Sequence, residues 1–497
     1  MVTNPPSAGA RMGTPAGRWV LLATISGSGM AMLDATVVNI ALPAIGRDLS
    51  ADFRTLQWIV NAYTLTLAAL ILLAGALGDH FGRRRVFVIG VVWFALASLL
   101  CGLAPSAQVL VIARALQGIG GALLTPGSLA IISSSFVAAD RAAAVGVWSG
   151  LGGVAAAIGP FLGGYLVALN WRAVFLINLP VAAFIVVISL RHVPETSDAQ
   201  SPPGLDVVGS VLTAAGLAGV TYALTSLGSG PGSATVMIAG AGGFVALLAF
   251  VLVERRSPHP LVPLGLFADR RFSVANAVTL LVYAGLGVFF FLLVLQLQIV
   301  AGFSPLVAGT ALLPVTVLML LLSARAGALA ERIGPRLPMT VGPLLAAMGF
   351  LLTLRIGREV SYLSDVLPAV VLLGLGLSLT VAPLTATVLS SADPRYSGTA
   401  SGVNNAIARS GGLLAVAVIP VAAGLGDADY TDPMSFNAGF HAAMLISAGL
   451  LALGSLLAAI LLREPYPEPI PTAERIPVER CSHCAITGPP LHPPLAR

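Results

Sequence analysis

Apolar runs of about 20 residues recur along the whole 497-residue chain, separated by charged or Pro/Gly-rich turns. A run of this length, wound as a helix, spans the roughly 30 Å hydrocarbon core of a bilayer. Only 9% of the residues are charged, whereas a soluble domain carries about 25%. We therefore expect an all-α polytopic membrane protein with about fourteen spans. The expected spans are 19–43, 56–77, 86–104, 108–132, 142–168, 173–190, 207–228, 235–253, 274–300, 306–330, 338–356, 366–390, 399–425 and 439–462.

Arginine residues concentrate in the turns that follow even-numbered spans, for example at 83–85 and 255–256. The opposite turns carry few arginine residues and include an acidic stretch with Asp427, Asp429 and Asp432. Because cytoplasmic loops are enriched in basic residues, both termini are predicted to be cytoplasmic, and the plasma membrane is the expected location. The net charge of +5 is explained by this orientation signal, so we expect no nucleic-acid partner.

All 26 basic residues are arginine, and the chain contains no lysine. A Walker A loop needs a lysine for the phosphates of ATP, so the chain has no such site of its own. We predict a transporter driven by an ion gradient, with neither enzymatic activity nor a cofactor. The Pro-rich tail is predicted to be disordered. Its Cys481, His483 and Cys484 fall short of the four ligands of a structural zinc site, so no metal site is predicted.

Two parts of the chain repeat one another. Residues 75–85 read GALGDHFGRRR and residues 327–336 read GALAERIGPR, an offset of 327 − 75 = 252. Gly118 and Gly120 reappear as Gly374 and Gly376, at an offset of 374 − 118 = 256. Repeated halves with a shared site at their interface are a transporter architecture. The predicted organisation is a cytoplasmic segment 1–18, a six-helix bundle 19–190, a linker 191–273 with two extra helices, a second six-helix bundle 274–462 and a cytoplasmic tail 463–497.

Six motifs follow one another on the expected helices. They are LDATVVNIALP (33–43), GALGDHFGRRR (75–85), LQGIGGAL (116–123), GPFLGG (159–164), WRAVFLINLP (171–180) and SGVNNAIARSG (401–411). Together they resemble the major facilitator superfamily, specifically its fourteen-helix drug–proton antiporter branch. The resemblance implies two six-helix bundles with two helices inserted between them. It also implies a multidrug efflux permease that exchanges protons for small hydrophobic substrates, and we expect a monomer.

Asp34 and Arg114 are charged residues inside apolar spans, where an ionised side chain costs about 2.5–3.5 kcal/mol on insertion scales. Asp34 lies roughly 22 Å from the cytoplasmic face, and Arg114 lies roughly 9 Å into a span that runs inward from the other face. At this similar depth they are expected to share one cavity. A change in their separation would load or release a proton, because a nearby guanidinium favours the ionised carboxylate. Asp34 is the predicted proton site and Arg114 its switch; the alternative is a polar lock between helices.

Asp79, Arg83 and Arg84 lie in the turn after the second span. The resemblance implies that this cluster stabilises the outward-facing gate state, whereas plain positive-inside anchoring is the alternative for the arginines. In the second half, Glu331 replaces Asp79, and Val370 stands where Arg114 would repeat. The coupling charge is therefore expected only in the first half.

The fifth span carries Gly159, Pro160, Gly163 and Gly164, the element typical of antiporters. Small residues let helices approach closely and slide, and a proline within a span permits a bend. The resemblance implies that this element is the pivot and seal of the cavity, and ordinary close packing is the alternative.

Candidates for the lining of the substrate cavity are mid-span polar side chains and one methionine: Met30, Asn39, Gln296, Gln298, Asn404, Asn405 and Arg409. For Arg409, a snorkelling side chain or a lock between helices is the alternative. The tenth span has no carboxylate at mid-span, whereas some relatives carry one that favours divalent organic cations. This departure argues against dicationic substrates.

The leading prediction is a proton-coupled secondary transporter that exports hydrophobic, drug-like compounds by alternating access. A dedicated exporter of an endogenous metabolite, lipid or siderophore would use the same machinery. A third hypothesis is a non-transporting membrane scaffold with the tail as its interaction module. An importer is disfavoured by the GPFLGG element.

Overall fold

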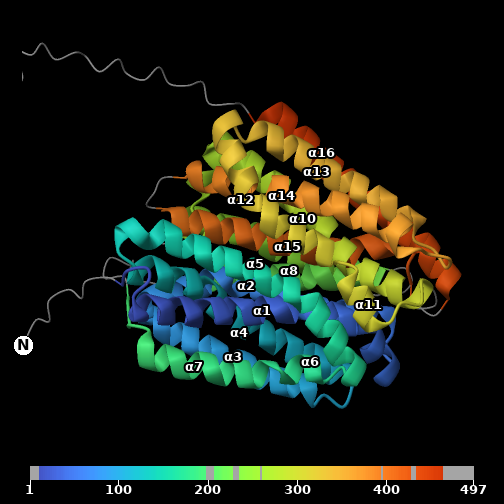
Figure 1. The fold of residues 1–497 in the computed structure, drawn as a ribbon, viewed down its shortest axis with the longest axis horizontal. Coiled ribbons are helices and arrows are strands. Elements are labelled where there is room, and N and C mark those ends of the chain that lie inside the picture. Colours follow the sequence, from blue (N-terminus) through green and yellow to red (C-terminus); the bar gives the residue numbers. More distant parts are fainter. Residues whose placement is uncertain are drawn as a thin grey trace, which may run out of the picture. The chain divides into compact units, whose positions relative to one another are not determined.

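The computed structural model describes residues 10–197, 206–227, 234–257, 260–392, 396–426 and 432–462. Nearly all of these residues are helical, and the long helices lie side by side (Figure 1). The tail 463–497, with Cys481, His483 and Cys484, lies outside the described residues, as do Asp427 and Asp429.

The first part of the chain forms a bundle in which polar side chains cap the ends of apolar helices. Thr14, Asp52 and Ser106 each accept a hydrogen bond from a backbone N–H in the first turn of the helix that follows. Gly82 separates two helices in a backbone conformation with φ of 106° that only glycine adopts readily. The helices are α1 (Pro15–Asp48), α2 (Phe53–Phe81), α3 (Arg83–Gly102), α4 (Ala107–Ser135), α5 (Ala138–Leu169), the short α6 (Ala173–Leu176) and α7 (Asn178–His192).

Two further helices, α8 (Val207–Ser226) and α9 (Ala234–Arg256), precede the second bundle. The second bundle contains two helices that change their winding, since α10 continues as a π-helical turn and α14 begins with one. Its elements are η2 (Leu264–Ala268), α10 (Arg270–Leu295), η3 (Gln296–Val300), α11 (Pro305–Thr310), α12 (Leu313–Ile333), α13 (Arg336–Leu352), η4 (Thr353–Arg355), η5 (Tyr362–Val366), α14 (Leu367–Ser390), α15 (Ser397–Ala422) and α16 (Pro433–Leu461).

Thirteen segments of the described residues are long and apolar enough to cross a membrane. The 32-residue α5 occupies the place of the expected fifth span. The prediction of an all-α polytopic protein with about fourteen spans is thereby confirmed. The helices extend past the predicted spans, as α1 does at both ends, because polar capping residues and the first and last turns lie outside the apolar runs.

The internal repeat is visible in the packing of the two bundles. Helix α4 packs against α2 and α3, and α14 packs in the same way against α12 and α13. A side chain at Gly118 would collide with the backbone of α2, and one at Gly120 with the backbone of α3. Gly374 lies against α12 in the same way, although less tightly, and Gly376 lies against the backbone of α13. The repeated glycines therefore make equivalent close approaches in both halves.

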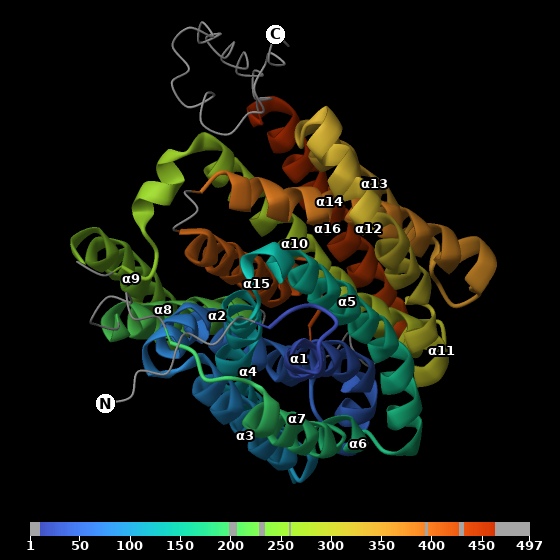
Figure 2. The same ribbon diagram turned by 60° about the vertical axis from the view of Figure 1, so that its left-hand side comes forward.

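The inserted helices lie against the seam between the bundles. Helix α8 packs against α2 and α15, whereas α9 packs chiefly against α8 and lies outermost in Figure 2. Only 6% of the residues in the most apolar stretch of α9 are buried. This helix therefore presents an apolar surface suited to lipid.

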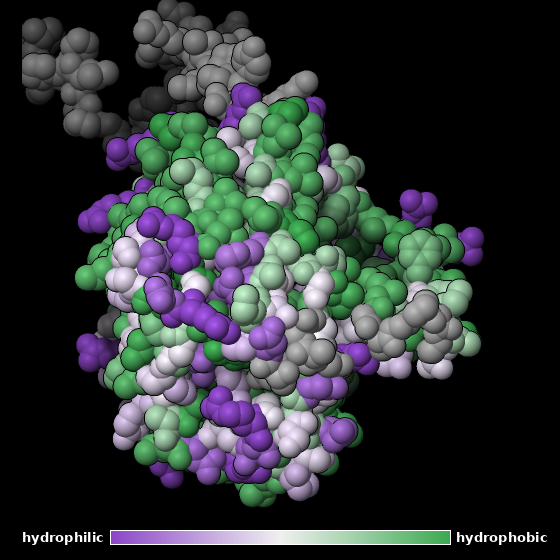
Figure 3. All heavy atoms as spheres, turned by 90° about the vertical axis from the view of Figure 1, so that its right-hand side faces the viewer, coloured by the Kyte–Doolittle hydropathy of each residue, from purple (hydrophilic) through white to green (hydrophobic). Residues whose placement is uncertain are grey.

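The end of the molecule at which α1 and α3 terminate, and which holds α6 and α11, is called the far end below. It is the right-hand end in Figure 1. Figure 3 views this end and shows hydrophilic side chains gathered over its lower and central part, with hydrophobic side chains above them. The opposite end, where α2 ends and α3 begins, is called the near end.

Candidate functional site

Asp34 of α1 and Arg114 of α4 form an ion pair inside the first bundle. The Arg114 Nη1 atom lies 2.6 Å from Asp34 Oδ2. Asp34 is 2% exposed and Arg114 is 1% exposed. The two residues were expected at similar depth, and the structure brings them into direct contact. Since either charge alone would be costly to bury, each side chain stabilises the charged form of the other.

Three uncharged polar residues complete a network around this pair: Gln117 of α4, Ser98 of α3 and Asn178 of α7. Gln117 donates to Asp34 Oδ1 (2.8 Å) and to Ser98 Oγ (2.7 Å). Asn178 donates to the same two atoms at 3.0 and 3.2 Å. Gln117 Oε1 accepts a hydrogen bond from Arg114 at 2.6 Å. The carboxylate therefore has donors on both of its oxygens, from two different helices.

Helix α2 holds the guanidinium of Arg114 from the opposite side. Arg114 Nε donates to the Ile59 carbonyl at 3.1 Å. The guanidinium carbon lies 4.3 Å from the centre of the Tyr63 ring and 5.9 Å from that of Phe175, within the range of a cation–π interaction. Gly118 makes this arrangement possible, because any side chain there would meet the Tyr63 carbonyl.

Sequence reasoning missed four members of this site: Ser98, Gln117, Tyr63 and Asn178. Asn178 carried a usable signal, since it is an amide within an apolar span of the WRAVFLINLP motif and such a group needs a partner. Ser98 carried none, because a serine in a span often bonds to its own helix.

The near-end cluster contains two acids. Arg83 Nε donates to Asp79 Oδ1 at 2.8 Å across the junction of α2 and α3. The backbone N–H of Arg84 donates to Glu195 Oε1 at 3.0 Å, and the Arg84 side chain lies 3.5 Å from Glu195 Oε2. Glu195, which was not predicted, thus ties the segment after α7 to the start of α3. Glu331, the predicted counterpart of Asp79, is exposed on α12.

The GPFLGG element lies where α5 meets α1 and α11. Gly159 and Gly163 face α1 so closely that a side chain would collide with it. Gly164 faces the backbone of α11, and Gly309 of α11 lies against the Pro160 carbonyl. The element therefore joins α5 to both bundles near the far end, as close packing through small residues allows.

Two cavity candidates are enclosed within a bundle. Met30 is 2% exposed in the core of the first bundle. Gln296 is fully buried, and its amide donates to the Ile356 carbonyl (2.8 Å) and to Asn437 Oδ1 (2.5 Å). Both side chains are therefore directed into their own bundle and away from the seam between the bundles.

The other amide candidates lie nearer the seam. Gln298 donates to the Ile40 carbonyl of α1 at 3.0 Å and so joins the two bundles at the far end. Asn39 is half-buried, and its Oδ1 has no hydrogen-bond partner among the described residues. Asn404 donates to two polar side chains of α10, whereas Asn405 is exposed and bonds within its own helix.

Arg409 lies in the middle of α15, with α2 on one side and α10 on the other. The titratable groups that face it are Tyr63 of α2 and Tyr283 of α10. Its side chain keeps part of its surface exposed, but its Nε atom is buried without a hydrogen-bond partner in the described part of the chain.

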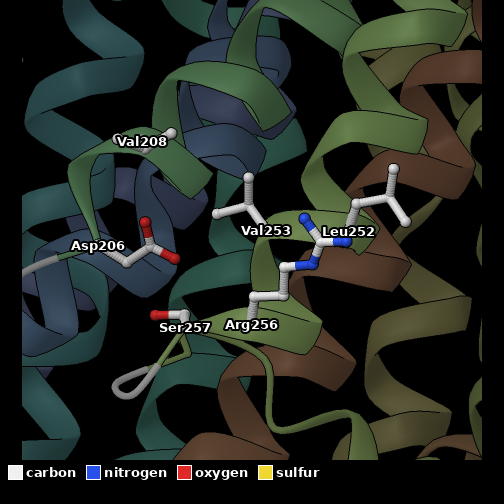
Figure 4. Close-up of a pocket in the computed structure, with 6 residues that line it drawn as sticks. All are labelled: Asp206, Val208, Leu252, Val253, Arg256 and Ser257. Atoms are coloured by element: carbon white, nitrogen blue, oxygen red, sulfur yellow. The ribbon is translucent and has the colours of Figure 1, made fainter.

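A pocket of about 380 Å³ lies between the ends of α8 and α9, and Figure 4 shows the carboxylate of Asp206 and the exposed Arg256 at its edge. It is lined by Asp206, Val208, Leu252, Val253, Arg256 and Ser257. None of these residues contributes to the Asp34 network or faces Arg409, so this pocket is separate from the candidate transport site.

The family model of the Major Facilitator Superfamily matches residues 24–416. The chain belongs to this superfamily. The predicted resemblance is thereby confirmed, and the chain is a multi-pass membrane transporter and not an enzyme.

Three curated relatives resemble most of the chain. The puromycin resistance protein pur8 of Streptomyces alboniger is 36% identical over 461 residues, which cover 89% of this chain and 91% of the relative. The multidrug efflux pump LfrA of Mycolicibacterium smegmatis is 35% identical, with 82% of this chain and 81% of the relative covered. The cephamycin export protein CmcT of Amycolatopsis lactamdurans is 35% identical, with 80% and 83% covered.

Solved structures show the same fold. A bacterial homologue of the human lysosomal transporter Spinster, in an inward-facing and unoccupied conformation, superposes with a TM-score of 0.64 at 17% identity. The match covers 90% of this chain and 97% of that structure. A peptide transporter in complex with sulfate superposes with a TM-score of 0.66 at 15% identity, covering 91% and 96%.

Proposed function

We propose that this protein exports drug-like compounds from the cytoplasm in exchange for protons, in the plasma membrane and with both termini cytoplasmic. The names of its relatives support export, since they describe puromycin resistance, multidrug efflux and cephamycin export. The observation that carries proton coupling is the carboxylate of Asp34, buried against Arg114 in the first bundle. Both bundles belong to one chain, so we propose that the monomer is the working unit.

The contacts between the bundles support a state closed at the far end, which we assign to the outside. Phe53 at the start of α2 contacts Phe291 of α10, with ring centres 5.7 Å apart. Gln298 bonds to α1, and Gly164 packs against α11, at the same end. We propose that a compound enters between the bundles from the near end, past the contact of α2 with Gly402 of α15 on one flank, and that rocking of the bundles opens the far end instead.

The Asp34 network provides the site at which the exchanged proton binds and from which it leaves. In the state described here Asp34 is paired with Arg114, and its two oxygens accept hydrogen bonds. When the far end opens, a proton from outside binds the carboxylate, and the hydrogen bond to Gln117 and the contact with Tyr63 keep Arg114 in place. Return to the near-end-open state restores the ion pair and releases the proton to the cytoplasm.

The proton gradient is sufficient for this task. One proton crossing a potential of ~150 mV supplies about 3.5 kcal/mol. At 1.4 kcal/mol per factor of ten, this energy sustains a gradient of roughly 300-fold for a neutral compound.

Transport into inverted membrane vesicles tests the proposal, with a panel of dyes and antibiotics and with or without an uncoupler. Asp34→Asn should abolish uphill transport while substrate binding persists. The matched control is Asp48→Asn on the same helix, which removes an exposed ion pair with Arg172 (2.7 Å) and should leave transport intact. Accumulation that survives the uncoupler, or that Asp34→Asn vesicles still achieve from a pH gradient, would contradict proton coupling.

A narrower function is the second candidate, namely export of one endogenous compound. Relatives named for a single compound favour it, such as the cephamycin export protein and the probable actinorhodin transporter of Streptomyces coelicolor. The same substrate panel separates the two, because a dedicated exporter would transport few or none of the dyes.

A further inference from the structure

The middle of the two bundles holds more positive than negative charge. Arg114 is neutralised by Asp34 at 2.6 Å. Arg409 lies about 12 residues, or roughly 18 Å, from the start of α15 and a similar distance from its end. Within the described residues it has neither an ion pair nor a hydrogen bond, and its buried Nε lacks a partner. One guanidinium at mid-span is therefore not compensated by a carboxylate.

Neither alternative for Arg409 accounts for this arrangement. A snorkelling arginine reaches the interface with its charged head, but roughly 18 Å of helix on either side exceeds the length of an arginine side chain. A lock between helices requires an acceptor on the neighbouring helix. The titratable groups close enough to act on the charge of Arg409 are Tyr63 and Tyr283. Both are uncharged at neutral pH, and in the described part of the chain neither hydroxyl forms a hydrogen bond with Arg409.

The position of Arg409 is at the seam between the bundles. Tyr63 belongs to α2 of the first bundle, and Tyr283 belongs to α10 of the second. Tyr63 also contacts the coupling site, since its ring lies 4.3 Å from the guanidinium carbon of Arg114. A molecule bound at Arg409 would therefore contact both bundles. The Tyr63 ring would lie between this molecule and the ion pair of Asp34 with Arg114.

A second polar group without a partner lies close by on α2. Asn61 is 1% exposed, and neither its amide nitrogen nor its oxygen has a hydrogen-bond partner in the described part of the chain. Gln57, one turn earlier on the same face, donates to the Val416 carbonyl of α15 at 2.9 Å. The near-end part of α2 lies against Gly402 of α15, whereas Gln57 at its far-end part bonds to Val416. The two helices are therefore antiparallel. Asn61 is therefore level with the turn of α15 that follows Arg409.

We propose that Arg409 binds the negatively charged group of the transported compound, with Asn61 as a second polar contact, so that the protein prefers organic anions. The proposal rests on the export function proposed above and adds the substrate class. A guanidinium stays charged in proteins and presents donors in a fork that matches a carboxylate, phosphate or sulfonate. Tyr283, half-buried on α10 beside α15, favours an apolar body attached to that acidic group. Helix α12 supplies no opposing charge, because its one acid, Glu331, lies at its near end.

The charge of the substrate also changes the charge moved in each cycle. Exchange of one proton for one neutral molecule moves one elementary charge across the membrane. Exchange of one proton for one monovalent anion moves two, because the anion leaves as the proton enters. Membrane potential acts on the net charge moved, so the accumulation ratio of an anion should depend on potential with twice the exponent found for a neutral analogue.

The test uses three probes that share one fluorescent body: pyrenebutyrate, its uncharged amide pyrenebutyramide and the cation pyrenebutylamine. Binding to the detergent-purified full chain is followed by pyrene fluorescence, and transport is followed in inverted vesicles. The variants are Arg409→Gln, Arg409→Lys and the control Arg255→Gln, which alters an exposed arginine at the end of α9.

We expect the wild type to bind the carboxylate about tenfold more tightly than the amide. Arg409→Gln should remove this preference while affinity for the amide changes by less than about twofold, and Arg409→Lys should keep part of it because the charge remains but the fork is lost. Equal affinity of the wild type for carboxylate and amide would overturn the proposal. So would an equal loss for all three probes in both Arg409 variants, which would mark Arg409 as structural.

The two proposals fail in different ways. If the wild type binds the carboxylate preferentially but a pH gradient drives none of the probes, the anion site stands and the export function is contradicted. If all three probes are driven equally and bind equally, the export function stands and the anion site is contradicted.

Discussion

The amide nitrogen of Asn178 lies 3.0 Å from Oδ1 of Asp34, although 144 positions separate the two residues in the chain. The contact joins α7 to α1 and completes a carboxylate that also receives donors from Gln117 and Arg114. The Asn178 amide is therefore one of three groups that favour the charged form of the predicted proton site.

Asn178→Leu should change the pH dependence of proton exchange. Without this donor the Asp34 carboxylate keeps only its hydrogen bonds from Gln117 and Arg114, so the proton no longer meets the same set of partners. Substrate-induced proton release from purified protein in weakly buffered solution, followed as a function of pH, measures the change. Asn170→Ala is the control, since Asn170 lies exposed at the end of α5. An unchanged midpoint would remove Asn178 from the coupling site.

Arg114→Leu should destabilise the protein by about 3–5 kcal/mol, because the buried Asp34 loses its counter-charge. The double variant Arg114→Leu/Asp34→Leu should recover much of this loss, since no charge is then left unpaired. Thermal unfolding in detergent, analysed as a double-mutant cycle, measures the coupling. If the two substitutions were simply additive, the ion pair would contribute nothing to stability.

Gly164→Val should destabilise the protein by about 1–3 kcal/mol and abolish transport. The new side chain would have to occupy the space held by the backbone of α11, which approaches the Cβ position to 2.6 Å. Gly146→Val on the same helix is the control, because nothing lies within 4 Å of its Cβ position. Unfolding temperatures and vesicle transport should distinguish the pair, and equal behaviour would refute a seal at Gly164.

Glu195→Gln should change stability by less than ~1 kcal/mol, because its ion pairs with Arg84 and Arg85 are partly exposed. An effect of that size on one gate state alone would still shift the balance between states by up to about fivefold. We therefore expect a change in transport rate with little change in unfolding temperature. A large loss of stability without a rate effect would show that Glu195 serves the fold only.

The sequence was sufficient for features that depend on local pattern. Apolar runs located the helices, and glycine spacing revealed the repeat, because Gly118 and Gly374 serve the same close approach in each bundle. Depth alone predicted that Asp34 and Arg114 share one cavity, with a polar lock between helices as the alternative, and the structure pairs the two directly.

Features that depend on the direction in which a side chain points could not be predicted from the sequence. Gln296 was predicted as a mid-span candidate for the cavity, but it begins the π-helical turn at the end of α10 and bonds to Asn437 within the second bundle. Asn178 and Glu195 depend on contacts more than 100 positions apart. No spacing rule connects such residues, because only the packed bundle brings them together.

Helix α8 contacts α2 of the first bundle and α15 of the second, and Trp58 and Tyr222 bring their rings to 6.4 Å across this contact. The inserted hairpin thus shields one flank of the seam from the surrounding lipid, while the opposite flank, between α5 and α12, has no inserted helix over it (Figure 2). A compound dissolved in the bilayer would consequently meet the inserted hairpin on one flank, and the packed helices α5 and α12 themselves on the other, so the two sides of the seam differ in what they present to lipid.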